Sequence, residues 1–152
     1  EFSMWAEKGQ AYKNTLIGLV DEDTAAFNLL MAAYGLTKGT DAEKTARTTA
    51  IQEAIKNAAQ VPFRVMETVL SSMEVIRAMA EHGNPNSVSD AGVGALAARS
   101  AVLGAFLNVK INAAGLTDKS FADSILKKGA EIQDKAVRTE KEILEIVNSK
   151  IG

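Results

Sequence analysis

Two aspartates are the side chains most suited to acid–base chemistry in this chain. Asp23 interrupts a run of apolar positions with 4-3-4-3-4 spacing, formed by Leu16, Val20, Asp23, Phe27, Leu30 and Tyr34. This spacing is typical of the packed face of a helix. A carboxylate on a buried face needs a partner, or its pKa rises, and such a poised group suits proton transfer. The alternative is a position that opens onto solvent or a polar partner. Asp21 lies about 200° away around a regular helix, so it forms no acid dyad with Asp23 and is kept as a substrate-binding candidate.

The second candidate is Asp90, together with the loop that precedes it. Asn84, Asn86 and Ser87 would surround the start of a helix, whose free N–H groups favour an anionic or amide-bearing ligand. Asn84, Asn86, Ser87 and Asp90 are therefore candidates for binding such a ligand. A structural interpretation accounts for the same residues, because Ser87 and Asp90 match a variant capping box and Asn86 follows Pro85 in a turn.

Two asparagines on an otherwise apolar helix form the third constellation. Asn108 and Asn112 are one turn apart and in line with Gly104, so their amides must bond across an interface or to a ligand. Asp90 shares their face of the helix but precedes Asn108 by five turns, about 27 Å. One small site in a single protomer cannot use both residues. A symmetry mate whose helix runs in the opposite direction could bring them together.

The sequence gives little indication of a metal site, a disulfide, a nucleophilic or phosphate-binding motif, or a nucleic-acid-binding surface. His82 is the one histidine and the chain has no cysteine, so we expect no metal site and no disulfide. No nucleophile elbow or phosphate-binding glycine loop is present. The absence of a basic block argues against binding to nucleic acid. The net charge is −2. We expect no membrane-spanning run and no signal peptide, and hence a cytoplasmic location.

Helices must position these residues. The first extends from about Phe2 to Tyr34, and Thr40 with Glu43 forms a capping box that opens the second. Pro62 predicts a kink or break near Gln60 in that second helix, which ends near Gly83. A helix over 88–114 is rich in small residues, which let another backbone approach closely, and Thr117 or Asp118 caps a last helix that ends near 148. We therefore predict an all-α antiparallel bundle of four to five long helices in a single domain, 1–152.

Several segments, in order, resemble one enzyme family. The segments are 19–28 (LVDEDTAAFN), 50–53 (AIQE), 61–65 (VPFRV), 84–93 (NPNSVSDAGV) and 107–112 (LNVKIN). They are similar to the cyclodeaminase domain of formiminotransferase-cyclodeaminase and to the related methenyltetrahydrofolate cyclohydrolases. The resemblance covers nearly the whole chain.

The resemblance implies a helical domain that forms a homodimer or higher homo-oligomer and binds a tetrahydrofolate derivative as substrate, without a metal. It implies cyclodeamination of 5-formiminotetrahydrofolate to 5,10-methenyltetrahydrofolate and ammonia, a step of histidine degradation, or the cyclohydrolase reaction. Asp23 and Asp90 would then transfer protons or recognise the pterin, and Asn108 and Asn112 would orient the ligand or neighbouring helices. A formiminotransferase domain in the parent chain is a possible partner.

One feature of the family is missing from the sequence. Family members begin with a helical stretch that carries a Pro-Gly-Gly-Gly-Ser motif, and this chain has no such motif. We therefore expect an N-terminally incomplete copy. The alternatives are a helical dimerisation or scaffold module without chemistry, an inactive fragment of the bifunctional enzyme, and a general helical partner-binding protein.

Overall fold

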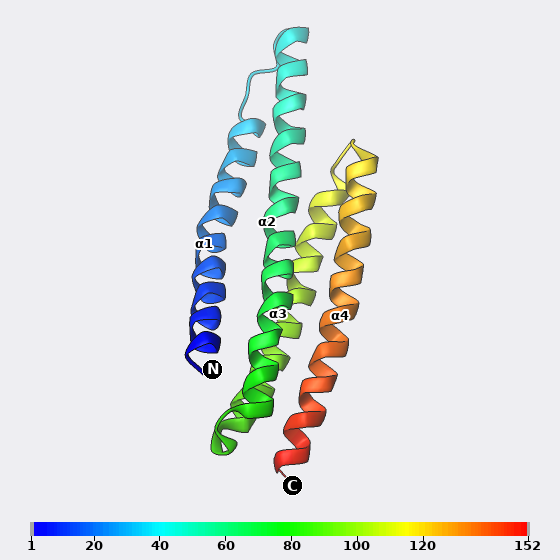
Figure 1. Cartoon of the computed structure of the whole chain (residues 1–152). Helices are drawn as coiled ribbons and strands as arrows, with labels where there is room; N and C mark the ends of the chain where they lie inside the picture. Colours follow the sequence, from blue (N-terminus) through cyan, green and yellow to red (C-terminus); the bar gives the residue numbers. More distant parts are fainter. Residues whose placement is uncertain (1, 152) are drawn as a thin grey trace.

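The computed structural model describes residues 2–151, and that part of the chain consists of four long helices and one short turn of 3-10 helix. The helices are α1 (Phe2–Tyr34), α2 (Asp41–His82), α3 (Val88–Ala114) and α4 (Lys119–Ile151), with η1 (Pro85–Ser87) between α2 and α3. They alternate in direction along the bundle (Figure 1). The predicted all-α antiparallel bundle is confirmed.

Helix α2 is the central element of the bundle. It packs against α1, α3 and α4, whereas α1 packs chiefly against α2 alone. In Figure 1, α1 stands at one edge of the molecule and α4 at the other, with α3 behind α2. One side of α1 and one side of α3 are therefore left without a neighbour in the protomer.

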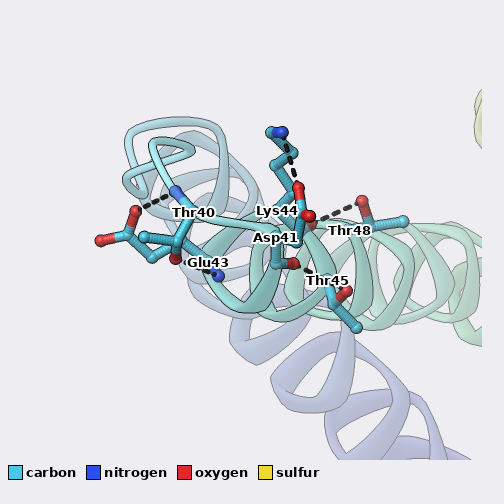
Figure 2. Close-up of polar contacts among 6 residues, drawn as sticks. All are labelled: Thr40, Asp41, Glu43, Lys44, Thr45 and Thr48. Atoms are coloured by element: carbon cyan, nitrogen blue, oxygen red, sulfur yellow. Dashed lines mark hydrogen bonds and ion pairs between the residues drawn. The ribbon is translucent and has the colours of Figure 1, made fainter.

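The helix starts follow from local capping chemistry. The Glu43 N–H donates to Thr40 Oγ1 at 3.2 Å, and the Thr40 N–H donates to Glu43 Oε2 at 2.8 Å (Figure 2), so the predicted capping box is confirmed. Donation by the Thr40 N–H also lowers the pKa of the Glu43 carboxyl. At α4, the Phe121 N–H donates to Asp118 Oδ1 at 3.0 Å, which identifies Asp118 rather than Thr117 as the cap.

The α3–α4 turn is held by two side chains of α2. Gln52 Nε2 donates to the Gly115 carbonyl at 3.1 Å, and Gln52 Oε1 accepts from the Thr117 N–H at 2.8 Å. Lys56 pairs with Asp118 at 3.3 Å. This contact and the N–H of Phe121 lower the pKa of Asp118, with the N–H as the larger cause. The glutamine in the segment 50–53 therefore has a structural role in joining three helices.

Small side chains let the helices of the core approach closely. Ala91, Ala95 and Ala98 of α3 are buried, and a Cβ at Gly92 would lie 3.3 Å from Val147 Cγ1 of α4. These contacts confirm the predicted close packing along this part of α3. A Cβ at Gly104, in contrast, would meet no atom within 4 Å. The use of glycine at that position has no explanation within the protomer.

The expectation that no segment could span a membrane needs correction. By length and composition alone, Pro85–Ala114 is long and apolar enough to do so, and 33% of its most apolar window is buried. The buried side of α3 faces the core of the bundle, with Val102 and Val109 at 0% exposure. The rest of its apolar surface is exposed, including Val93, Leu96, Leu107 and Ile111.

Candidate functional site

A groove lies between α1 and α3, with α2 as its floor. Pro62, Val65 and Val69 of α2 form the floor, and Ala101, Ala105 and Asn108 of α3 form one wall. The other wall belongs to α1, with Leu16, Leu19, Val20, Asp23 and Thr24. Its volume is about 510 Å³. Three polar side chains from two helices thus meet in an otherwise apolar groove, which is the usual composition of a small-molecule site.

The predicted packed face of α1 is correct only for Leu16 and Leu30, which are half-buried and pack against the core. Val20 and Phe27 are 65% and 58% exposed, and Asp23 is exposed as well. The buried residues are Leu19, Ala26 and Ala33, which have the same periodicity but lie on an adjacent side of the helix. Short side chains face α2 because they allow a close approach of the two helices. The stripe that contains Asp23 lies beside this contact and borders the groove.

An ion pair fixes α1 against α2 next to Asp23. Both guanidinium nitrogens of Arg64 bond to the carboxylate of Glu22, and this hydrogen bond is the main cause of the raised pKa of Arg64. Glu22 is adjacent to Asp23, and Arg64 follows Pro62 by two residues. Two of the family-like segments therefore meet here, one from each helix. Asp21 is exposed and is not among the residues that line the groove.

The two asparagines of α3 have different roles. Asn112 Nδ2 donates to the Ala58 carbonyl of α2 and to the Asn108 carbonyl, at 3.0 Å each. Ala58 lies four residues before Pro62, and proline has no N–H for the carbonyl four positions earlier. Asn112 supplies that missing donor. Of the predicted kink or break, the break is wrong, since α2 continues through Pro62, and Asn112 joins α2 to α3 at this point. Asn108 is exposed and lines the groove.

Asp90 lies in a separate hollow at the far end of α3. Val75, Ile76 and Met79 of α2 form one side of this hollow, and Asn84, Ser87 and Asp90 contribute its polar atoms, with a volume of about 410 Å³. It shares no lining residue with the hollow that contains Asp23 and Asn108. As predicted from the sequence, Asp90 and Asn108 do not share one site within a protomer.

The predicted capping box at Ser87 is wrong. Ser87 occupies the N-cap of α3 but makes no side-chain capping bond. The turn is organised instead by Asn84, whose Oδ1 accepts from the Asn86 N–H at 3.0 Å. Within the described residues, the side chains of Ser87 and Asp90 have no protein hydrogen-bond partner, and both are exposed.

A third hollow, of about 270 Å³, lies between the other two. It shares Leu16 with the Asp23 hollow, and it shares Val75 and Ile76 with the Asp90 hollow. We call the three hollows together the α1–α3 groove, because the largest of the three lies between these two helices. Lys13 lines its middle part. The sequence reasoning did not single out Lys13 or Thr24, because one lysine or threonine on a helix has no distinctive spacing.

The N-terminal half of α1 carries a polar cluster outside the predicted site. Tyr12 Oη donates to Glu74 Oε1 at 2.7 Å, and Lys8 Nζ pairs with the same carboxylate at 3.2 Å. The Tyr12 hydrogen bond, followed by the Lys8 contact, lowers the pKa of Glu74. The same hydrogen bond raises the pKa of Tyr12. In residues 2–151 no group of three or more His, Asp or Glu side chains is placed to hold a metal ion.

Comparisons with known proteins agree on one family. The family model described as formiminotransferase-cyclodeaminase matches residues 1–131. Methenyltetrahydrofolate cyclohydrolase of Methylorubrum extorquens is 41% identical over 146 residues, which cover 96% of this chain and 70% of that protein. Formimidoyltransferase-cyclodeaminase of Rattus norvegicus is 38% identical over 108 residues, which cover 71% of this chain and 20% of that protein.

A solved structure shows the same fold. Formiminotetrahydrofolate cyclodeaminase of Thermotoga maritima superposes with a TM-score of 0.79 at 24% sequence identity. The match covers 94% of this chain and 67% of that one. The antiparallel arrangement of long helices is therefore shared with that enzyme, although the sequences have diverged widely.

Proposed function

The chain belongs to the formiminotransferase-cyclodeaminase family, and on that premise we propose that it acts on the one-carbon bridge of a tetrahydrofolate. Its relatives are enzymes of folate one-carbon metabolism, named for the cyclohydrolase and cyclodeaminase reactions. Both reactions share 5,10-methenyltetrahydrofolate. Of the two, we favour the cyclohydrolase reaction, since the relative of that name aligns over 96% of the chain. Cyclodeamination of 5-formiminotetrahydrofolate is the alternative.

The observation that carries the proposal is the position of Asp23 in the α1–α3 groove, opposite Asn108. In the cyclohydrolase reaction, water adds to the methenyl carbon and loses one proton. The bond from that carbon to N5 then breaks as the remaining hydroxyl proton passes to N5, which gives the 10-formyl product. The methenyl bridge is cationic, so a carboxylate nearby stabilises the bound substrate and accepts the proton of the attacking water. In our proposal Asp23 has this role and Asn108 orients the ring.

The test is an assay of the chain with methenyltetrahydrofolate, in which turnover removes the absorbance of the methenyl bridge. Asp23→Asn keeps the size of the side chain but removes its charge, and we expect kcat to fall by about 10²–10⁴-fold. Asp21→Asn is the matched control and should turn over normally, because Asp21 is outside the groove. Normal turnover by Asp23→Asn would remove Asp23 from the mechanism. Ammonia release from 5-formiminotetrahydrofolate distinguishes the cyclodeaminase alternative.

A second proposal, a homodimer, follows from the exposed apolar surface. Val20, Phe27, Leu107 and Ile111 are each more than half exposed, on the two helices that border the groove. Large apolar side chains clustered on exposed faces mark interaction surfaces. We propose that a second copy, with its α3 antiparallel, covers these faces and brings its Asp90 towards Asn108 of the first. A monomeric mass in light scattering would contradict the dimer, and an associating chain that binds no folate would favour the scaffold alternative.

A further inference from the structure

The α1–α3 groove is longer than a pterin ring needs. Its three hollows follow one another along α2, and they share Leu16 at one junction and Ile76 at the other. Beyond Asp23 the lining becomes apolar, and the next polar side chains are Tyr12 and Lys13 of α1 and Ser72 of α2. A ligand anchored at Asp23 can therefore extend along α1 towards Lys13 without leaving the groove.

The charges of the groove are unevenly distributed. Among the described residues that line its three hollows, Lys13 is the single cation, and Asp23 and Asp90 are the anions. Lys8, one turn further along α1, is already paired with Glu74 at 3.2 Å. Lys13 makes no hydrogen bond or ion pair with any side chain of residues 2–151. Its ammonium group is therefore free to bind an anion.

The spacing of Lys13 and Asp23 along α1 suits the span from the one-carbon position of a folate to its glutamyl group. Lys13 and Asp23 are ten residues apart on one helix, which corresponds to a rise of about 15 Å. A folate has an N–H-rich pyrimidine ring at one end and glutamyl carboxylates at the other, joined by a bicyclic ring and a benzoyl group in line. With the one-carbon position beside Asp23, the carboxylate can accept from the N5 and N10 N–H groups of tetrahydrofolate, and apolar Leu16 and Val69 lie between there and Lys13.

We infer that Lys13 binds the glutamyl carboxylate of the folate and so selects folates over pterins and pteroates that lack glutamate. The inference rests on the proposed function, because it takes a tetrahydrofolate as the ligand. It also fixes the direction of the ligand, with the pterin at Asp23 and the glutamate towards the N-terminus of α1. The reverse direction would place the carboxylates beside Asp23, where like charges repel.

The experiment compares tetrahydrofolate with the neutral amide of tetrahydropteroate, which keeps the benzoyl amide but lacks the glutamyl carboxylates, by calorimetric titration of the chain. We expect tetrahydrofolate to bind about three- to tenfold more tightly, which is the effect of one partly exposed charge-assisted bond. Lys13→Gln should remove that advantage and leave the affinity for the neutral amide unchanged. Lys13→Arg should restore it. Lys38→Gln, which changes the net charge equally but lies outside the groove, should behave like the unaltered chain.

The outcomes separate this inference from the proposed function. If the chain binds both ligands and Lys13→Gln weakens them equally, or weakens neither, the assignment of Lys13 is overturned and the proposed function stands. If the unaltered chain binds neither ligand, the proposed function fails and the inference fails with it. Asp23→Asn provides the complementary arm, since it should weaken both ligands by the same factor.

Discussion

The side-chain amide of Asn112 donates to the main-chain carbonyl of Ala58 at 3.0 Å, and Ala58 is the residue whose helical partner would be the N–H of Pro62. A proline inside a helix leaves the carbonyl four positions earlier without a donor. An unpaired carbonyl in a partly buried place costs about 1–3 kcal/mol. The contact therefore accounts for a long helix that tolerates a proline near its middle, and it fixes the register of α3 against α2.

The cost in stability of losing this contact should depend on Pro62. Asn112→Ala should lower the free energy of unfolding by about 1–3 kcal/mol, because the Ala58 carbonyl then has no donor. In a Pro62→Ala background the same change should cost less, by about 1 kcal/mol, since residue 62 then supplies its own N–H. Guanidinium unfolding monitored by circular dichroism measures both values. Asn108→Ala is the control for helix propensity, and an equal cost in both backgrounds would contradict the argument.

The sequence predicts the starts of α2 and α4 because the signals there are local. Thr40 and Glu43 are three residues apart in the chain and contact each other in the structure, so the capping box can be found without knowing the fold. The same applies to the carboxylate of Asp118, which caps the helix that directly follows it. The same local signal at Ser87 and Asp90 is wrong, because Asn84 organises that turn instead.

The inner face of α1 is a different case, since it depends on a partner that is distant in sequence. The helix carries two apolar stripes, one with Val20 and Phe27 and one with Leu19 and Ala26. Periodicity identifies both, and the larger side chains favour the first as the core face. The structure buries the second, because alanine allows α1 to lie close to α2. Likewise, Asn112 can be singled out as an amide that needs a partner, but the sequence does not place it opposite Ala58.

The Tyr12–Glu74 contact predicts a pH dependence of stability. The pKa of Glu74 is lowered in the folded chain, mainly by the Tyr12 hydroxyl and then by Lys8. A lowered folded pKa means that this contribution is present above the unfolded value of 4.5 and is lost as the pH falls through the folded value. Tyr12→Phe should therefore cost up to about 1 kcal/mol at neutral pH, and less in acid. Urea unfolding at neutral pH and near pH 3 tests this, and Tyr34→Phe serves as control. A cost of Tyr12→Phe that is larger near pH 3 than at neutral pH would contradict this prediction.

Gly129 of α4 is required by the packing of α3. A Cβ at this position would lie 2.8 Å from Cδ2 of Phe106, whose side chain is only 3% exposed. The ring is buried among the helices, so it cannot move aside freely, and overpacking of a core typically costs about 1–3 kcal/mol. Replacement of a glycine in a helix returns about 0.5–1 kcal/mol. We therefore expect Gly129→Ala to lower the thermal unfolding midpoint, whereas an unchanged or higher midpoint would show that Phe106 repacks at little cost.

Gly104 of α3 provides the opposite case, and it tests the proposed dimer. A Cβ there would meet no atom within 4 Å in the protomer, so Gly104→Ala should stabilise an isolated chain by about 0.5–1 kcal/mol through helix propensity. Gly104 lies on the exposed side of α3, near Leu107 and Ile111. If a second copy packs closely on this side, the added methyl group and the larger Gly104→Leu should weaken association and raise the fraction of monomer in sedimentation. Gly18→Ala, on α1 and with equally open surroundings, is the control for propensity alone. Equal self-association by Gly104→Leu and the unaltered chain would exclude this side of α3 from the interface.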